Sequence, residues 1–98
     1  MKKFGLKFTP ETARILSRLH PENKKLIKQA LVELGKNPYA GSDLQEELYG
    51  FKAFKLKRFR VLYKISEEDN IIQIYHIGHR KDVYEQFHRL LTELKKPS

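Results

Sequence analysis

The sequence contains no cysteine, which excludes disulfide bonds, thiolate zinc sites and a cysteine nucleophile. This absence also fits a reducing cytoplasm, where we expect the protein to be located. No apolar run approaches the roughly 20 residues that a membrane-spanning helix needs, so we expect no membrane partner. The first residues turn polar before an apolar signal core can form, which argues against secretion. A glycine-rich phosphate loop and a serine nucleophile elbow are also absent.

Acidic residues are few relative to basic ones. The chain of 98 residues holds 12 Asp and Glu against 20 Lys and Arg, which gives a formal net charge of +8 and an isoelectric point near 9.8. This charge favours a polyanionic partner, such as a nucleic acid or an acidic protein, and the hydropathy disfavours a membrane. The length allows one compact domain with one core, so we expect residues 1–98 to form a single domain.

The histidines lack the spacing of a metal site. His76 and His79 could bracket an ion only in a sharply bent segment, and no third ligand is evident. We therefore expect neither a metal nor any other cofactor. His76 with Glu46 or Glu47 is a candidate acid–base pair, but nothing in the spacing brings these residues together, and a histidine within a strand is more often structural.

One strand and two helices are predicted for the N-terminal half. Alternating apolar residues predict a half-buried strand at residues 3–8. Thr9 supplies an N-cap hydroxyl before the first helix, Pro21 opens the second, and Gly35 is the expected left-handed C-cap. The first helix is expected to bury Ala13, Leu16 and Leu19, and the second to bury Leu26, Ile27, Ala30, Leu31 and Leu34.

Three strands and a helix are predicted for the C-terminal half. Residues 51–55 and 59–65 form a hairpin around residues 57–58, and residues 71–77 form an apolar strand that Gly78 ends. Asp82 with Glu85 resembles a capping box. The last helix is expected to bury Val83, Phe87, Leu90, Leu91 and Leu94. The order β-α-α-β-β-β-α predicts an α+β fold: a small antiparallel (mixed) sheet with an N-terminal αα-hairpin and a C-terminal helix packed on one face.

Residues 51–65 interleave basic with apolar side chains and contain no acid. Such a segment should bury one face in the core and turn the other toward an anion, and a phosphate backbone suits a row of cations. Lysines on an exposed strand also discourage edge pairing, an alternative that explains one or two of them but not the whole set. The basic residues are Lys52, Lys55, Lys57, Arg58, Arg60 and Lys64.

A second candidate site follows the last predicted strand. His79, Arg80 and Tyr84 bring an imidazole, a guanidinium and a phenol to a junction between strand and helix. Loops that a rigid sheet positions are places where functional residues concentrate. The alternative makes His79 a polar loop residue and Tyr84 a core aromatic residue with its hydroxyl at the surface.

Two motifs together resemble the RelE/ParE superfamily of toxin–antitoxin toxins. The first is Leu48-x-Gly50 followed by residues 51–65, and the second is the apolar strand that ends in Ile77-Gly-His-Arg-Lys-Asp-Val-Tyr84. The element order also fits, so the resemblance covers nearly the whole chain. Residues 57–59 depart from the family pattern, because they read Lys-Arg-Phe where Gly-Asp-Tyr is common.

The resemblance implies three possible functions. RelE-like members are metal-independent endoribonucleases that cut mRNA in the ribosomal A site, so their partners are the ribosome with its rRNA, mRNA and a cognate antitoxin that blocks the basic face. ParE-like members inhibit DNA gyrase and have no RNase site. A degenerate toxin would be a non-catalytic basic module that binds nucleic acid or the antitoxin. The basic and aromatic residues at the family's site positions favour the first function.

The resemblance also implies a role for each site residue. Arg60 and Arg80 would bind phosphate through their guanidinium forks. Lys55 would be the base, because nearby cations disfavour its charged form. Tyr84 would stack on a nucleobase or orient the 2′-hydroxyl. The expected catalytic residues are thus Lys55, Arg60, Arg80 and Tyr84, with His79 as the alternative acid or base, and Lys52, Lys57 and Arg58 are expected to bind further RNA phosphates.

Overall fold

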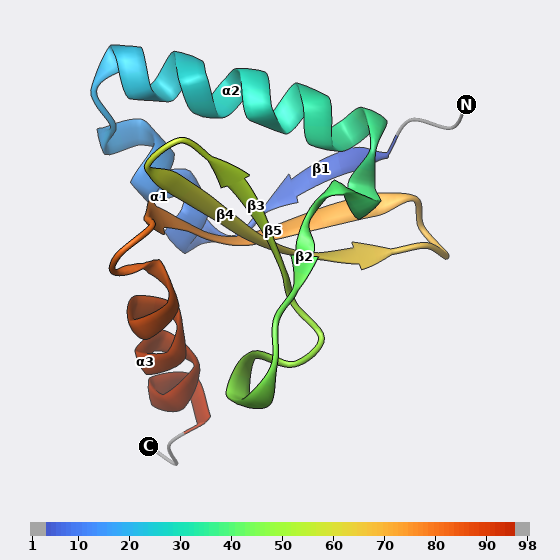
Figure 1. Cartoon of the computed structure of the whole chain (residues 1–98), viewed down its shortest axis with the longest axis vertical. Coiled ribbons are helices and arrows are strands. Elements are labelled where there is room, and N and C mark those ends of the chain that lie inside the picture. The colour runs from blue at the N-terminus through green and yellow to red at the C-terminus, as the bar shows by residue number, and fades with distance from the viewer. Residues whose placement is uncertain (1–3, 96–98) are drawn as a thin grey trace.

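The computed structural model describes residues 4–95, and its elements follow the predicted order (Figure 1). One short strand, β2, is added in a segment for which no strand was predicted. The elements are β1 (Gly5–Phe8), α1 (Pro10–Arg18), α2 (Pro21–Lys36), β2 (Ser42–Asp43), β3 (Lys52–Leu56), β4 (Phe59–Ser66), β5 (Ile71–His79) and α3 (Val83–Lys95), with 3₁₀ helices at Pro38–Ala40 and Glu46–Leu48.

The strands of residues 4–95 form one mixed sheet in the order β1-β5-β4-β3-β2. β1 runs parallel to β5, and all other neighbours are antiparallel. β5 has a strand on each side, which agrees with the central position expected for its continuous apolar residues. β3 and β4 pair as far as Leu56 and Phe59, so Lys57 and Arg58 form the hairpin turn as predicted.

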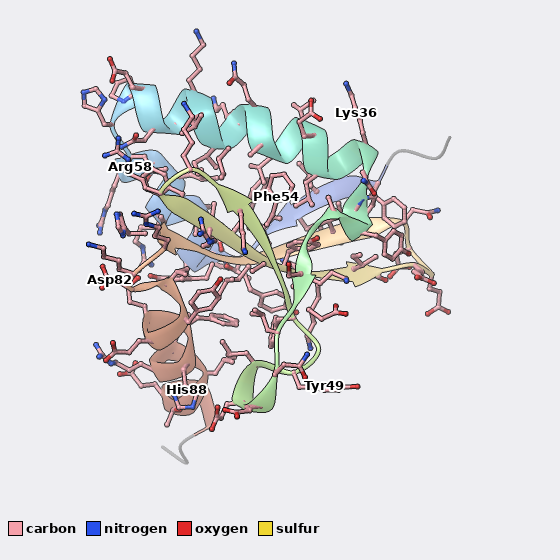
Figure 2. The ribbon with its side chains drawn as sticks, viewed as in Figure 1. Lys36, Tyr49, Phe54, Arg58, Asp82 and His88 are labelled. Atoms are coloured by element: carbon pink, nitrogen blue, oxygen red, sulfur yellow. The ribbon has the colours of Figure 1, made fainter. Side chains whose placement is uncertain are left out.

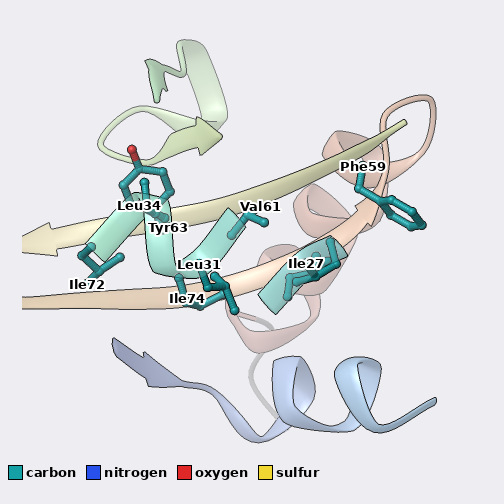
Figure 3. Close-up of a cluster of buried hydrophobic side chains, with 9 residues drawn as sticks. Ile27, Leu31, Leu34, Phe59, Val61, Tyr63, Ile72 and Ile74 are labelled. Carbon is teal, nitrogen blue, oxygen red and sulfur yellow. The ribbon is translucent and has the colours of Figure 1, made fainter. Parts of the chain in front are cut away.

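The sheet is covered on both faces, which corrects the expectation that all helices share one face. Helices α1 and α2 pack on one face, and α3 packs on the other (Figure 1). β4 shows the division, because Val61 and Tyr63 belong to one apolar cluster and Leu62 to the other. The buried members of the first cluster are Ile27, Leu31, Leu34, Phe59, Val61, Tyr63, Ile72, Ile74 and Ile77 (Figure 3), and those of the second are Leu48, Phe51, Ala53, Leu62, Val83 and Phe87.

A β-bulge in β5 decides which of its side chains face α3. Leu62 pairs with His76 and Tyr63 pairs with Ile74, so Tyr75 has no partner on β4. The bulge shifts the alternation by one residue. Ile74 and Ile77 therefore both lie in the first cluster, while Tyr75 and the His76 ring contact Phe87 of α3. The apolar pattern of the strand gave no sign of this shift.

The beginning of α1 agrees with one prediction and corrects another. Thr9 caps the helix, because its hydroxyl oxygen accepts a hydrogen bond from the N–H of Thr12 at 3.1 Å. Thr12 is buried and Ala13 is exposed, so the predicted burial of Ala13 is wrong. The Thr12 hydroxyl donates to the carbonyl oxygen of Ile74 at 3.2 Å, and this bond satisfies the polar group inside the core.

Gly35 is not the left-handed cap of α2. The helix continues to Lys36, and the N–H of Asn37 closes it by donating to the carbonyl oxygens of Glu33 and Leu34. Pro38 explains this end point, because a proline disfavours helical geometry in the residue before it. The end of α2 is thus set by the proline instead of the glycine.

Gly78 does not end β5 either. The strand continues to His79, and Gly78 pairs with Arg60 of β4. A Cβ atom at residue 78 would lie 3.2 Å from Val83 Cγ2 and 3.2 Å from Gln86 Oε1. Glycine is therefore needed for the close approach of α3 to the strand, and a strand break is not its role.

Helix α3 begins directly after Asp82, as predicted. The Glu85 carboxylate pairs with Arg89 at 3.3 Å, one turn further on, instead of reaching back to the start of the helix. Val83 and Phe87 are buried, and Leu90 and Leu91 are half-buried. The side chain of Leu94 and the residue Lys3, both included in predicted elements, lie outside the described part of the chain. Within that part, no helix has the length and apolar character to cross a membrane.

Candidate active site at the β3–β4 hairpin

Two of the predicted site residues, Lys55 and Arg60, lie in one row across three neighbouring strands. Lys55 of β3 pairs directly with Arg60 of β4, and Arg60 pairs with Gly78 of β5. Side chains two residues apart on a strand share a face. Lys55 and Arg60 therefore lie on the same face as Ala53 and Leu62, which is the face that α3 covers. The two cations have directly opposed Cβ positions, about 5 Å apart in such pairs.

The Arg60 guanidinium is fixed by the hairpin turn. Its Nη1 donates to the carbonyl oxygen of Lys57 at 3.0 Å and to that of Phe59 at 2.8 Å. Lys57 has a φ of 51°, a left-handed conformation that is uncommon for a residue with a side chain. Both bonds use one nitrogen, so the other N–H groups of the guanidinium can bind an anion.

No carboxylate neutralises this group of cations. Within residues 4–93, the ion pairs involve the cations of Arg14, Lys52 and Arg89. Lys55, Arg60 and Arg80 form none of these pairs. Unpaired cations placed side by side repel one another, and an anion that binds between them removes this repulsion. The arrangement suits a phosphate.

Arg80 comes directly after β5, and its backbone is hydrogen-bonded to the hairpin turn. Its N–H donates to the carbonyl oxygen of Arg58 at 2.6 Å, which ties the chain after β5 to the hairpin turn. Lys57, Arg58 and Arg80 are all exposed. Figure 2 shows Arg58 and Asp82 at the same end of the molecule, with Lys36 at the other. The structure therefore brings Arg80 to the hairpin, as predicted.

Tyr84 and His79 lie on opposite faces of the sheet. Tyr84, in the first turn of α3, is half-buried against the second cluster, on the face of Lys55 and Arg60. His79 pairs with Phe59, and the two rings contact each other edge to face with centroids 6.4 Å apart. Its Nδ1 accepts a hydrogen bond from the N–H of Lys81 at 3.2 Å. The strand alternation thus separates His79 from the row that contains Lys55.

Lys52 is not grouped with the other predicted site residues. Its ammonium donates to the Asp43 carboxylate at 2.7 Å and lies 6.0 Å from the centroid of the Tyr39 ring. Strand alternation turns it to the face opposite Lys55. The Lys64 ammonium, which was also counted in the basic segment, lies 4.3 Å from the centroid of the Phe51 ring. These two lysines have structural partners.

His76 has the structural setting expected of a strand histidine, but its contacts with α3 were not predicted. It is 6% exposed, and its Nε2 lies 3.4 Å from Gln86 Oε1. Its Nδ1 has no hydrogen-bond partner among residues 4–95. Burial lowers the pKa of His76 below its usual value. The polar partner of His76 is Gln86 of α3, and not Glu46 or Glu47. A histidine inside an otherwise apolar run was the only available signal. Among residues 4–95, no three His, Asp or Glu side chains gather in a way that could hold a metal ion.

Comparisons with known proteins agree with this architecture. A family model described as the ParE toxin of the type II toxin–antitoxin system parDE matches residues 6–84. The chain belongs to the RelE/ParE superfamily of toxins. This membership confirms the resemblance noted in the two sequence motifs.

Relatives in the superfamily cover most of the chain. Toxin RelG of Mycobacterium tuberculosis is 29% identical over 83 residues, which span 83% of this chain and 95% of RelG. The toxin–antitoxin complex RelBE2 of the same organism contains a chain with 27% identity and a TM-score of 0.74, covering 81% of this chain and 100% of that one. A double mutant of Escherichia coli toxin RelE in the free state has a TM-score of 0.75 at 14% identity, over 97% of this chain and 100% of that one, and shares the fold.

Proposed function

We propose that this RelE/ParE toxin is a ribosome-dependent, metal-independent endoribonuclease that cleaves mRNA in the ribosomal A site and so inhibits translation. The observation that supports this function best is the direct pairing of Lys55 with Arg60, neither of which forms an ion pair among residues 4–93. Arg80 is tied to the same hairpin through Arg58, and Tyr84 lies on the same face. These contacts support a site that combines Lys55 and Arg60 of the hairpin with Arg80, and with Tyr84 of the helix on the same face.

The proposed reaction is attack of a ribose 2′-hydroxyl on its own 3′-phosphate. The 2′-oxygen forms a bond to phosphorus while the bond to the 5′-oxygen breaks, which yields a 2′,3′-cyclic phosphate and a 5′-hydroxyl. Lys55 is the candidate for removing the proton of the 2′-hydroxyl, and Arg60 and Arg80 stabilise the charge that develops on the phosphorane. Tyr84 stacks on a base or orients the 2′-hydroxyl. The leaving 5′-oxygen takes a proton from a donor that these residues do not specify.

The position of His79 bears on the choice of base. Lys55 lies beside Arg60 in the row of cations, whereas the ring of His79 packs on Phe59 at the other face. This geometry supports Lys55 over His79 as the base. Lys57 and Arg58, exposed at the turn, would bind neighbouring phosphates of the mRNA. Lys52 fits this role less well, because its ammonium already binds Asp43.

We also propose that a cognate antitoxin binds this chain and covers its basic face. The relatives of known structure include toxin–antitoxin complexes from M. tuberculosis and E. coli. An acidic partner would gain the Coulomb energy that the row of unpaired cations offers. The ribosome, mRNA and the antitoxin would all be met in the cytoplasm.

A second candidate function is inhibition of DNA gyrase. The match to the ParE family model favours it.

One experiment separates the two functions. The purified toxin is added to mRNA-programmed ribosomes, and the mRNA ends are mapped. In parallel, the toxin is added to a gyrase supercoiling reaction. Cuts within A-site codons and unaffected supercoiling are expected. Intact mRNA together with trapped gyrase–DNA complexes would replace the first proposal with the second. If neither reaction responds, the protein is a non-catalytic basic module.

A further inference from the structure

His76 connects the central strand to α3. The β-bulge at Tyr75 turns its ring toward the helix, where it stacks on Phe87 with ring centroids 5.8 Å apart and planes 23° apart. Its Nε2 lies 3.4 Å from Gln86 Oε1 of the same helix. The ring therefore contacts two consecutive residues of α3, one through a polar atom and one through its face.

Helix α3 has two buried anchors, and its Tyr84, Leu90 and Leu91 are half-buried against the same cluster. Among residues 83–93, only Val83 and Phe87 are buried. Val83 approaches the strand closely at Gly78, where a Cβ atom would lie 3.2 Å from Val83 Cγ2. Phe87, the second anchor, is the residue on which His76 stacks, and it also contacts Phe51 with ring centroids 4.9 Å apart. Tyr75 also contacts Phe87, so the His76 ring is one part of the packing that positions α3.

The position of α3 in turn sets part of the candidate active site. Tyr84 lies between the two anchors, directly after Val83. The helix follows Arg80 by three residues, and the N–H of Arg80 is bonded to the hairpin. A shift of α3 on the sheet would therefore move the phenol relative to Lys55 and Arg60, which are fixed to each other by strand pairing.

We propose that His76 is a positioning residue: its neutral ring holds α3 against β5, and protonation of the ring releases the helix and misplaces Tyr84. The link to catalysis rests on the proposed RNase function, whereas the link between His76 and α3 does not. The residue touches no substrate and acts only through the helix.

The surroundings of His76 favour the neutral ring. Burial lowers its pKa, and the hydrogen bond to Gln86 and the charge of Glu11 on α1 oppose this effect only in part. The other charged or titratable groups that line the neighbouring cavity of about 510 Å³ are His79 of β5 and Arg89 and Glu93 of α3. Gln86 Oε1 can accept from Nε2–H in either charge state. Protonation of Nδ1, in contrast, would place a buried N–H and a charge where there is no acceptor.

The first test is an NMR titration of the complete protein across the usual histidine pKa of about 6.5. The His76 ring signals are expected to titrate below this usual value. The amide signals of α3 should shift with the His76 midpoint, and those of α2 should not. Titration of His76 at or above this usual value, or α3 signals that do not respond at its midpoint, would overturn the proposal.

The second test compares mRNA cleavage by wild type, His76→Phe and His88→Gln over the same pH range. His76→Phe keeps an aromatic ring on Phe87 and lacks the titrating nitrogen, so it should lose less activity on acidification than wild type. His88→Gln, an exposed change on the same helix, should follow wild type. Equal pH profiles for wild type and His76→Phe would contradict the positioning role. If wild type cleaves no mRNA, the proposed function fails, and the NMR titration still decides the link between His76 and α3.

Discussion

The Nη1 of Arg60 donates to the carbonyl oxygen of Lys57 at 3.0 Å, so a residue expected to bind RNA phosphate also closes the hairpin turn. The turn lacks the glycine or asparagine that two-residue hairpins prefer. The Arg60 side chain compensates by bonding the carbonyl groups of the turn. The proposed phosphate binding and the turn geometry would therefore both depend on one guanidinium, and changes at Arg60 and Lys57 should separate the two effects.

Arg60→Lys keeps the charge but removes the guanidinium fork. We expect the rate of mRNA cleavage to fall about 100-fold, the usual loss when one donor to a developing oxyanion is removed. The measurement is single-turnover cleavage on programmed ribosomes. Arg89→Lys, a matched change at an exposed pair on α3, should keep the wild-type rate. Equal rates for Arg60→Lys and wild type would show that the fork does not contact the reacting phosphate.

Lys57→Gly removes the strain of a left-handed side-chain residue. That strain is about 1–2 kcal/mol, and the entropy cost of glycine is about 0.5–1 kcal/mol, so the free energy of unfolding should rise by about 0.5–1 kcal/mol. Urea unfolding measures this change. The same variant should bind RNA more weakly, because a cation is lost from the turn. A lower stability would mean that Lys57 makes contacts in solution that offset its strain.

Gly78→Ala should destabilise the fold by about 1–3 kcal/mol, the usual cost of overpacking. The added Cβ would lie 3.2 Å from both Val83 and Gln86, and the helix would have to move. Gly5→Ala is the matched control, because its Cβ would have only Asn70 O nearby, at 3.9 Å. Urea unfolding of both variants measures the difference. Similar stabilities for the two would show that α3 yields without cost at this contact.

Tyr63→Phe should lower the free energy of unfolding by about 1–3 kcal/mol, because it removes a buried hydroxyl with two partners. The hydroxyl donates to Pro38 O at 2.7 Å and accepts from the N–H of Gly41 at 3.0 Å. Burial raises the pKa of Tyr63, so the folded state holds the phenol proton more tightly than the unfolded chain does. The contribution of the Tyr63 hydroxyl to the free energy of unfolding is therefore complete below about pH 10. It is lost as the pH rises through the pKa of the folded state.

Urea unfolding of wild type and Tyr63→Phe at neutral and alkaline pH checks both parts of this prediction. The difference between the two proteins should shrink at alkaline pH. A difference that stays constant would show that the buried phenol does not ionise in that range. Cleavage of mRNA at neutral pH should be unchanged, since Tyr63 lies on the face opposite Lys55.

Much of the fold followed from local patterns in the sequence. The cap at Thr9, the proline at the start of α2 and the alternation around residues 57–58 each depend on residues close in the chain. The errors arose where distant segments meet. Thr12 is buried in place of Ala13 because a carbonyl group of β5 accepts its hydroxyl proton, and Tyr75 forms a bulge that no period of apolar residues reveals.

The candidate site was likewise predictable only where it depends on residues close together in the chain. A hairpin turn at residues 57–58 places Lys55 opposite Arg60, so this pair followed from the sequence once the turn was located. The face on which His79 lies depends on its pairing with Phe59, which joins two strands across a separate turn. Because His79 is next to Arg80 in the chain, the sequence suggested that His79 lies with Lys55 and Arg60. Strand alternation instead places His79 on the opposite face.

The most direct test of the account maps mRNA ends after ribosomes programmed with one mRNA are mixed with wild type, Lys55→Ala/Arg80→Ala or Lys28→Ala/Lys36→Ala. The last variant removes the same charge from exposed positions on α2, and Figure 2 shows Lys36 at the end of the molecule away from the turn. We predict A-site cuts with wild type and the α2 variant and loss of cleavage with Lys55→Ala/Arg80→Ala. Full-rate cleavage by the Lys55→Ala/Arg80→Ala protein would contradict the assignment of this face as the active site.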